Sequence, residues 1–317
     1  MLRKKTKVVA GIDLGGTNTR IGLVNAHGKI LAKDSVMTEE FQEPKKFAEV
    51  VCKKILFLVS GLGALNPELI GVGIGAPNGN FFSGSIEFAP NLRWKGKIPL
   101  AKMFSEKLKV KTLLTNDANA AALGEMIFGG AKRMKDFIFI TLGTGLGSGI
   151  VVNGEMVYGH DGFAGEIGHV IVESNGRPCD CGRKGCLEQY CSATGIVNTY
   201  LEKEQRTKGK GRRKKADAKI IYDRAKAGEK TAIESFNITG AMLGFALANS
   251  VAYTSPQAIF LFGGLANAGN FIFTPARKSF EKNLLRIWKN KIKILPSQLP
   301  EDDAAILGAA SLIWKED

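Results

Sequence analysis

Two stretches of the chain repeat one unusual design, and this duplication constrains the fold more than any other feature. In residues 12–25 and again in residues 140–153, an apolar segment runs into a turn rich in glycine and threonine, and a second apolar segment follows. The second segments end at reversals that contain Asn25 and Asn153. Apolar segments around a short glycine turn are typical of β-hairpins. The sequence therefore predicts two hairpins at related places in two similar halves of the molecule.

The glycine tips of these hairpins are candidates for binding phosphate groups. Glycine lacks a Cβ, so successive backbone N–H groups can turn toward an anion, and threonine hydroxyls add donors. An ordinary glycine turn is the alternative for either hairpin alone, but the duplication favours phosphate binding. Asp13, on the strand before the first tip, is expected to face Mg²⁺ through water, because Mg²⁺ prefers oxygen ligands and retains several waters. The predicted phosphate-binding residues are Gly15, Gly16, Thr17, Gly143, Thr144 and Gly145.

Elsewhere strands and helices alternate, which predicts an α/β fold. Apolar runs at residues 72–76 and 137–142 are expected to form buried strands. Asp302 or Asp303 is placed to cap the final helix. Helices are predicted at residues 45–62, 118–128, 218–227, 232–252, 275–289 and 303–314.

Two other phosphate-binding motifs are excluded. The chain has no G-x-x-x-x-G-K-[ST] sequence, so a P-loop is absent. Residues 71–76 formally fit the dinucleotide pattern G-x-G-x-x-G/A, but Pro77, Asn78 and Gly79 follow where a helix would have to begin. We therefore expect residues 75–79 to form a sharp exit from a strand, against which a sugar could lie.

A cluster of potential metal ligands follows the second hairpin. Three of the five cysteines lie within eight positions, and a histidine precedes them. Three thiols and one imidazole match tetrahedral Zn²⁺, which is fully protein-coordinated in structural sites. Gly182 and Gly185 would let the backbone fold tightly around the ion. A disulfide or buried free thiols are the alternatives. The predicted zinc ligands are His169, Cys179, Cys181 and Cys186.

Composition limits the class of protein. A chain of 317 residues with 44% hydrophobic content can bury a large core and suits two domains. No apolar run reaches the ~18 residues that a membrane span needs, and residues 1–7 lack the apolar stretch of a secretory signal. We therefore expect a cytoplasmic protein without a membrane partner, in which Cys52 and Cys191 are free, packed thiols.

The net charge of +14 could indicate a nucleic-acid partner. Much of the excess lies in residues 203–215, a basic run interrupted by glycine and lacking aromatic residues. Such a run is more typical of a solvated, mobile loop than of a binding groove. No nucleic-acid partner is expected, and attraction of anionic nucleotides is the lesser alternative.

Asp117 is the candidate catalytic base. It follows Asn116 where an apolar strand ends and an alanine-rich helix starts. Phosphoryl transfer to a hydroxyl group requires the acceptor to be held in line beside a base. A helix N-cap is the alternative role for an acid at this point, and it would explain Asp117 without explaining Asn116.

The region around the cysteines resembles the signature of the ROK family of sugar kinases and repressors. The family pattern G-E-x-G-H, then C-x-C-G-x-x-G-C-x-E, is matched at residues 165–169 and 179–188, and the resemblance extends from Gly11 to the C-terminus. It implies an actin-like (ribonuclease H-like) two-domain sugar kinase fold with a cleft between the domains. A smaller α/β domain would comprise residues 1–116 and about 300–317, and a larger one residues 117–299 with the zinc loop.

The resemblance also implies roles for individual residues. Asn116 would recognise a sugar hydroxyl, and Asp117 would accept the proton of the hydroxyl that attacks the γ-phosphate. Gly263 and Gly264 form a turn that would approach the adenosine. Buried sugar hydroxyls need fixed hydrogen-bond partners, and His169 could bind zinc with one ring nitrogen and a hydroxyl with the other. The expected sugar-binding residues are Asn91, Asn116, Asp117, Glu166, His169 and Glu188; Phe81, Phe82 and Trp94 are further candidates to line the pocket.

The expected function is ATP-dependent phosphorylation of the 6-hydroxyl of glucose, with ATP, Mg²⁺ and structural Zn²⁺. N-acetylmannosamine, N-acetylglucosamine, allose and fructose are alternative substrates, and polyphosphate is an alternative donor. A sugar-sensing transcriptional regulator is the alternative from another class. Only residues 1–10 precede the first phosphate strand, which is too short for the helix-turn-helix domain of such repressors, so the kinase is favoured. The family also implies a homo-oligomer, a dimer or a tetramer.

Overall fold

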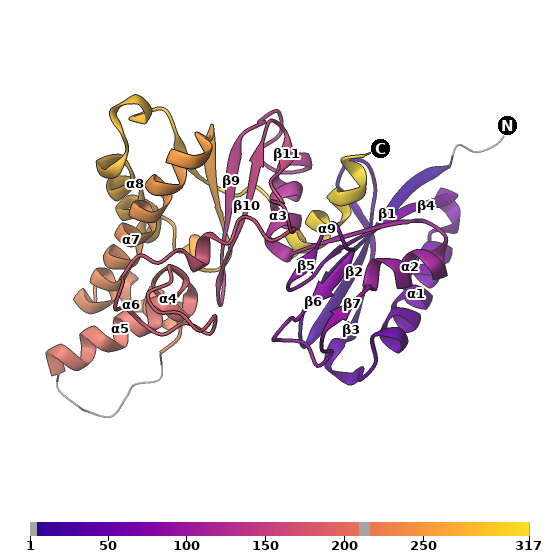
Figure 1. Ribbon diagram of the computed structural model, residues 1–317, viewed down its shortest axis with the longest axis horizontal. Coiled ribbons are helices and arrows are strands. Elements are labelled where there is room, and N and C mark those ends of the chain that lie inside the picture. The colour runs from indigo at the N-terminus through magenta and orange to yellow at the C-terminus, as the bar shows by residue number, and fades with distance from the viewer. Residues whose placement is uncertain (1–4, 209–215, 317) are drawn as a thin grey trace. The chain divides into compact units, whose positions relative to one another are not determined.

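A computed structural model describes residues 5–208 and 216–316, apart from the side chains of residues 206–208. The chain divides into two compact units, each with helices packed on a mixed five-stranded sheet (Figure 1). Unit 1 comprises Met1–Met134, Met156–Ala164 and Gln298–Asp317, and unit 2 comprises Lys135–Glu155 and Gly165–Ser297. No helix in the described ranges is both long enough and apolar enough to cross a membrane.

The main sheet of unit 1 has the strand order β3-β2-β1-β4-β8. Strands β1 and β2 form the predicted first hairpin, and β4 and β8 continue the sheet in parallel with β1. A small second sheet contains β5, β6 and β7. The strands are β1 (Thr6–Leu14), β2 (Asn18–Val24), β3 (Ile30–Met37), β4 (Pro67–Gly75), β5 (Gly79–Asn80), β6 (Ser85–Glu87), β7 (Lys97–Ile98) and β8 (Lys111–Thr115). The helices are η1 (Thr38–Glu40), α1 (Pro44–Gly61), η2 (Gly63–Leu65), α2 (Leu100–Leu108), α3 (Asp117–Ile127) and α9 (Ala304–Trp314).

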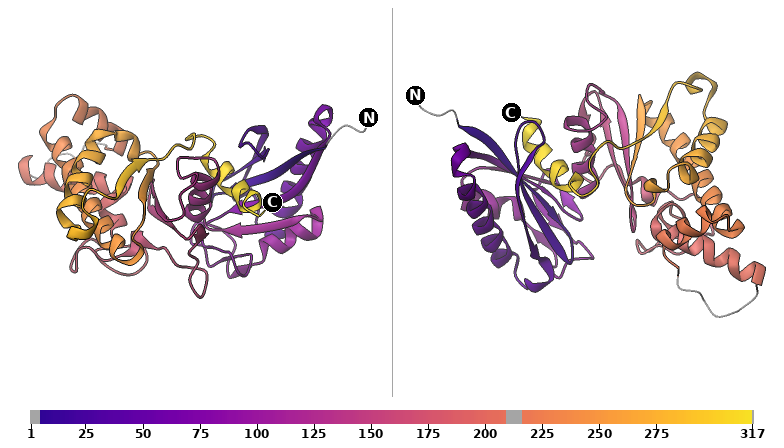
Figure 2. Two further views of the ribbon diagram at one scale, coloured as in Figure 1. Left: turned by 90° about the horizontal axis from the view of Figure 1, so that it is seen from above. Right: turned by 180° about the vertical axis from the view of Figure 1, so that it is seen from behind.

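Alternation of large and small residues gives the sheet of unit 1 two different faces. On β1 and β4, Ile12 and Ile74 point into the core that α1 and α2 cover, because successive side chains of a strand point to opposite faces. Gly11 and Gly73 alternate with them, and α9 lies against this second face (Figure 2). A Cβ on Gly73 would stand 1.8 Å from the carbonyl oxygen of Ala309 in α9. The bare backbone on this face therefore permits α9 to pack directly on the sheet.

Unit 2 repeats the same topology. Its strand order is β11-β10-β9-β12-β13, with β9 antiparallel to β10 and parallel to β12. The two similar α/β halves and both predicted hairpins are thus confirmed. The strands are β9 (Phe137–Leu142), β10 (Leu146–Val152), β11 (Glu155–Met156), β12 (Ala258–Phe262) and β13 (Lys293–Pro296). The helices are η3 (Ile167–His169), α4 (Glu188–Cys191), α5 (Ala193–Lys208), α6 (Ala218–Lys226), α7 (Lys230–Thr254), η4 (Ala266–Ala268), α8 (Asn270–Asn283) and η5 (Arg286–Trp288).

Three local predictions differ from the structure. The helix predicted at residues 275–289 is α8, which begins at Asn270 and contains Pro275; the proline ring packs over Gly240 of α7, where a Cβ would stand 2.5 Å from it. Asp303 precedes α9 but makes no side-chain cap and pairs with Lys33 instead. The basic run at residues 203–215 begins inside α5, and its residues 209–215 lie outside the described residues.

The compact units also divide at a different place from the predicted domains of residues 1–116 with 300–317 and 117–299. Helix α3 belongs to unit 1 because it packs on α9 through small residues. A Cβ on Gly124 would stand 2.9 Å from the Cα of Gly308, and one on Gly308 would stand 2.7 Å from the carbonyl oxygen of Ala120. Unit 1 therefore carries Asp117 together with the first glycine tip.

Candidate functional site

Three neighbouring strands of unit 1 end at one edge of the sheet. Asp13 on β1 lies beside Gly75 on β4, and Gly75 lies beside Thr115 on β8. The first glycine tip continues from β1, and α3 begins with Asp117 directly after β8 and Asn116. A Cβ on Gly75 would stand only 3.7 Å from the Cα of Asp117. The sheet register therefore brings the two candidate carboxylates to the same edge.

The helix cap at this edge is Asn116. Its side-chain oxygen accepts a hydrogen bond of 2.6 Å from the backbone N–H of Asn119, and α3 starts one residue later. Asp117 stands in the first helical turn, and its Oδ1 accepts a bond of 2.8 Å from the N–H of Ala118. The alternative in which Asp117 is the cap is therefore wrong. With the cap supplied by Asn116, the carboxylate of Asp117 can serve another purpose.

Asp117 is accessible to solvent, yet protein atoms surround much of the carboxyl group. This desolvation raises its pKa above the ordinary carboxyl range, and the smaller effect of the backbone hydrogen bond from Ala118 opposes it. A raised pKa strengthens a carboxylate as a base, because the ideal catalytic pKa lies near the working pH.

The second carboxylate has a cationic partner that the sequence analysis missed. Arg20 lies opposite Asp13 in the hairpin register, and two guanidinium nitrogens lie 3.2 Å from Oδ2 of Asp13. Burial raises the pKa of Asp13, Arg20 lowers it, and the charge of Asp117 raises it again. The register of the predicted hairpin could have revealed Arg20, since a tip at residues 15–17 places it across from Asp13.

The two glycine tips use their backbone groups in the same way. In the first, the N–H of Gly15 donates to the carbonyl oxygen of Asn18 at 3.0 Å, and in the second, Gly143 donates to Gly145 at 3.0 Å. Among the described residues, the next two N–H groups of each tip, at positions 16–17 and 144–145, have no hydrogen-bond partner. Each tip thus presents consecutive unpaired donors, as an anion-binding turn requires.

Further candidate residues lie beside the tips of their own units. In unit 1, a Cβ on Gly16 would stand 2.4 Å from the carbonyl oxygen of Asn91, so Asn91 lies against the first tip. In unit 2, a Cβ on Gly263 would stand 2.8 Å from the carbonyl oxygen of Leu142, where the second tip begins. Gly263 has a φ of +99°, which favours glycine, and Gly264 beside it has open space where a side chain would be.

Glu188 also lies against the second tip. It is the first residue of α4, and its Oε2 accepts a hydrogen bond of 2.9 Å from the N–H of Leu146. A Cβ on Gly145 would stand 2.4 Å from the same oxygen. Glu166 immediately precedes η3 and is exposed. Glu188 is therefore held at the second glycine tip. Glu166 lies three residues before His169 in the chain.

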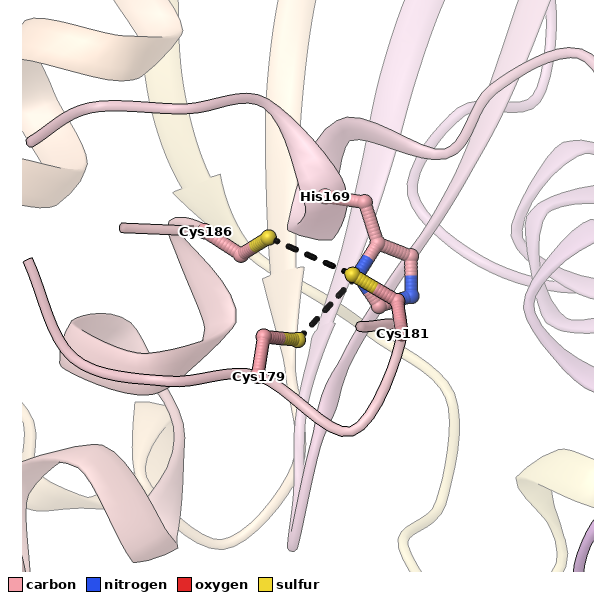
Figure 3. Close-up of side chains that lie close together, drawn as sticks. All are labelled: His169, Cys179, Cys181 and Cys186. Atoms are coloured by element: carbon pink, nitrogen blue, oxygen red, sulfur yellow. Dashed lines mark hydrogen bonds between the residues drawn. The ribbon is translucent and has the colours of Figure 1, made fainter. Parts of the chain in front are cut away.

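The four predicted zinc ligands converge (Figure 3). The Sγ atoms of Cys181 and Cys186 are 3.6 Å apart, Sγ of Cys179 is 3.7 Å from Nδ1 of His169, and all four ligand atoms lie within 4.8 Å of one another. Tetrahedral Zn²⁺ with sulfur ligands would separate them by about 3.8 Å. The predicted turns are present, since Gly182 and Gly185 have φ of +86° and +76°. The residues therefore fit zinc.

The thiols of this cluster differ in acidity. Arg183 beside Cys181 lowers the pKa of that thiol to about 6, whereas burial raises the pKa of Cys186 to about 12. Metals bind the thiolate form of cysteine. The lowered pKa of Cys181 favours its thiolate before any metal binds, whereas Cys186 would lose its proton when the metal binds. The remaining cysteines, Cys52 and Cys191, are buried free thiols as predicted.

One aromatic candidate for the sugar pocket is excluded. Trp94 is buried in the core of unit 1 against Phe47, and its indole N–H donates to the carbonyl oxygen of Phe41. Phe81 stacks on Tyr158 at 4.2 Å, and Phe82 remains 61% exposed. Trp94 thus stabilises the core, because a buried indole both packs well and needs a partner for its N–H group.

Comparison with known proteins agrees with this combination of an actin-like duplicated fold, glycine tips and a Cys₃His loop. The chain belongs to the ROK family, whose pattern matches residues 9–316. It is 35% identical over 316 residues to a glucokinase of Thermotoga maritima, covering 98% of each chain.

A solved ROK family glucokinase from Streptomyces griseus, in complex with glucose and AMPPNP, is 32% identical with a TM-score of 0.75, covering 96% of this chain and 98% of the other. A xylose repressor of Bacillus spizizenii is 29% identical, covering 99% of this chain and 78% of the repressor. The actin-like two-domain sugar kinase fold is therefore confirmed.

Proposed function

We propose that this protein is a glucokinase that transfers the γ-phosphoryl group of ATP to the 6-hydroxyl of glucose. The observation that carries the proposal is the position of Asp117, which lies at the same sheet edge as Asp13, on either side of Gly75, while Asn116 caps the helix. A carboxylate with a raised pKa at such an edge is suited to accept a hydroxyl proton. Full-length relatives named glucokinase support glucose as the acceptor.

In unit 1, Asp117 would take the proton as the 6-oxygen attacks the γ-phosphorus. A new O–P bond forms, the bond from phosphorus to the β–γ bridging oxygen breaks, and ADP leaves. The unpaired amides of Gly16 and Thr17 would hold phosphate oxygens, and Asp13 would hold Mg²⁺ through water. Mg²⁺, when bound to ATP, neutralises the charge of the phosphates. Asn91 and Asn116 would hold sugar hydroxyls.

In unit 2, the amides of Thr144 and Gly145 would hold further phosphate oxygens, and the open side of Gly264 would leave room for the adenine ring. Glu166, His169 and Glu188 would accept hydrogen bonds from sugar hydroxyls. A carboxylate that accepts such a bond discriminates strongly, because a sugar lacking the hydroxyl would leave it buried and unpaired.

Zinc would hold in shape the loop from His169 to Glu188, called here the sugar-binding loop. Cys179, Cys181, Cys186 and Nδ1 of His169 would be its four ligands, leaving no open position for chemistry on the metal. With Nδ1 turned toward the thiols, Nε2 of His169 would face a sugar hydroxyl. A reducing compartment such as the cytoplasm suits these free thiols. The proposal also includes assembly into a homo-oligomer, a dimer or a tetramer.

A sugar-sensing regulator is the second candidate, since xylose repressors resemble the chain. Asp117 and both glycine tips favour the kinase, because a sensor has no need for a base beside the sugar or for phosphate donors. Within the kinases, N-acetylmannosamine, N-acetylglucosamine, allose and fructose remain candidate substrates.

The test is a coupled assay of ADP release with Mg·ATP against these five sugars, with Asp117→Asn as control. A glucose-dependent rate that the substitution abolishes would support the proposal, and a higher kcat/KM for another sugar would revise the substrate. Polyphosphate in place of ATP, followed by sugar phosphate formation, tests the donor. Sugar binding without turnover with either donor would favour the sensor.

A further inference from the structure

Arg177 lies two residues before Cys179, in the loop that runs from His169 to Glu188 and carries the proposed zinc ligands, and its side chain is extensively hydrogen-bonded. All five N–H bonds of its guanidinium have an acceptor: Nε and one terminal nitrogen donate to Glu202 at 2.8 Å, and the others reach Thr199, Gln189 and Gly195 at 2.7–3.1 Å. Its side chain is only 14% exposed. An arginine with every donor used and little contact with water is held in one geometry, unlike an exposed ion pair.

The acceptors of Arg177 connect two helices. Gln189 belongs to α4, and the other three acceptors belong to α5. The guanidinium also lies 4.5 Å from the centre of the Tyr190 ring, while the backbone N–H of Arg177 donates to the Tyr190 hydroxyl at 2.8 Å. Helix α4 has only four residues, and so short a helix has no stability of its own. Its orientation must come from such tertiary contacts.

Helix α4 begins with Glu188, whose Oε2 binds the N–H of Leu146 at the second glycine tip. Among the described residues, no hydrogen bond reaches its Oε1, which leaves that oxygen for a ligand. Leu187, at the N-cap position, makes no side-chain cap, and its backbone N–H donates to the carbonyl oxygen of Val170 at 2.9 Å. The carboxylate of Glu188 is thus held directly by Leu146, while the bonds from Arg177 to the peptide oxygen of Gln189 and to Tyr190 hold the following residues of α4 and so restrain the direction from which Glu188 approaches the tip.

The zinc cluster restrains a different part of the same loop. Its ligands hold the hairpin of residues 179–186 to His169, and Arg183 reinforces this with a bond of 2.9 Å to the carbonyl oxygen of His169. At the base of the loop, the carbonyl oxygen of Arg177 accepts the N–H of Gly185 at 2.8 Å. The ligand Cys186 lies two residues before Glu188, and its carbonyl oxygen accepts the N–H of Gln189 at 3.0 Å, so the metal holds the chain just before α4 while Arg177 holds α4 itself.

We propose that Arg177 is a positioning residue of Glu188: it fixes the direction of α4, which carries this sugar-binding carboxylate, whereas zinc fixes His169 and Cys186. This inference rests on the proposed function. Because the guanidinium contacts no zinc ligand directly, its loss changes sugar affinity without releasing the metal.

Arg177→Met tests this, because methionine keeps much of the apolar stem and removes the guanidinium. We expect KM for glucose, and Kd for glucose by calorimetry, to rise about tenfold or more, as loss of a charge-assisted hydrogen bond would produce. KM for ATP should change less than about threefold, and zinc content should stay at the wild-type value. Arg224→Met is the matched control: Arg224 also lies over a tyrosine ring, that of Tyr200, and pairs with a glutamate, Glu229, and neither partner belongs to α4 or to the loop.

A double-mutant cycle with Glu188→Gln separates positioning from general stabilisation. If Arg177 acts through Glu188, adding Arg177→Met to Glu188→Gln weakens glucose binding by less than about threefold more. Additive losses, loss of zinc, or a glucose Kd equal to that of Arg224→Met would overturn the inference. If Arg177→Met does not fold, Glu202→Gln, which weakens the bidentate pair, should shift glucose Kd in the same direction by a smaller factor.

Glucose binding tests the role of Arg177, and phosphoryl transfer tests the proposed function, so the two can fail separately. A wild-type protein that binds glucose but transfers no phosphoryl group contradicts the kinase, and glucose Kd still tests Arg177. If another sugar of the panel is the ligand, its Kd takes the place of glucose Kd. A wild-type protein that binds none of the sugars contradicts both.

Discussion

Replacing Gly145 with alanine should separate the second glycine tip from the carboxylate of Glu188, the proposed sugar-binding group. The new Cβ would stand 2.4 Å from Oε2 of Glu188, about 1 Å less than a normal carbon–oxygen contact. Since the obstacle is the end of a flexible side chain, the carboxylate can move away and the fold survives. A displacement of about 1 Å would stretch its 2.9 Å bond to the N–H of Leu146 beyond hydrogen-bonding distance.

A hydrogen bond to a charged group contributes about 1.5–3 kcal/mol, which corresponds to a ten- to 150-fold change in an equilibrium constant. We therefore expect Gly145→Ala to raise the glucose Kd by about this factor when Glu188 loses its fixed position. The assay is calorimetric titration with glucose in the absence of nucleotide, supported by KM for glucose in the coupled assay.

Gly143→Ala is the matched control for this experiment. It adds the same methyl group to the same tip, but nothing lies within 4 Å of the new Cβ. Its glucose Kd should stay close to that of the wild-type protein. If Gly145→Ala also binds glucose within twofold of wild type, the argument that Glu188 must keep its present position is refuted.

Three further predictions concern the base, the metal and the core. Asp117→Asn should lower kcat by about 10²–10⁴ while glucose Kd changes little. In the unsubstituted enzyme the carboxylate must be ionised, so kcat/KM should fall as pH decreases through a pKa above the ordinary carboxyl range; an acid limb at the usual value would contradict the desolvation of this group. Elemental analysis should find one zinc per chain, and Cys181→Ser should lower both zinc content and glucose affinity; wild-type zinc content in the variant would exclude this ligand set. Gly73→Ala should lower the free energy of unfolding by about 2 kcal/mol or more, because its Cβ would overlap a backbone carbonyl of α9. Denaturant unfolding measures this against Gly61→Ala, which meets nothing and should be neutral or stabilising by up to about 1 kcal/mol.

The hairpins and the ligand cluster were predictable because their signals are local. Apolar alternation around a glycine turn identifies a hairpin within fifteen residues or so, and the register then follows from the turn. The thiols of Cys179, Cys181 and Cys186 are close in sequence, so a few turns bring them together. The choice of Nδ1 of His169 as the atom facing the thiols depends on the path of η3 and could not be predicted.

Where prediction failed, distant packing overruled local preference. Pro275 suggested the start of a helix, but a glycine on α7 makes room for its ring within α8. Asp303 has the residue type of a cap, but Lys33 on β3 attracts its carboxylate. The cap of α3 was decided locally instead: Asn116 holds that position, so the alternative role of Asp117 as the cap is wrong.

The sequence by itself determined which chemistry is available: two glycine tips, a Cys₃His set, and acids at the ends of strands. Only the tertiary structure decided which of these groups meet. The register of β1, β4 and β8 places Asp13 beside Asp117, and the packing of α4 on α5 gives Arg177 its acceptors. Turn and hairpin signals depend on neighbouring residues, whereas these pairings arise from burial of surfaces far apart in the chain, which sequence spacing does not record.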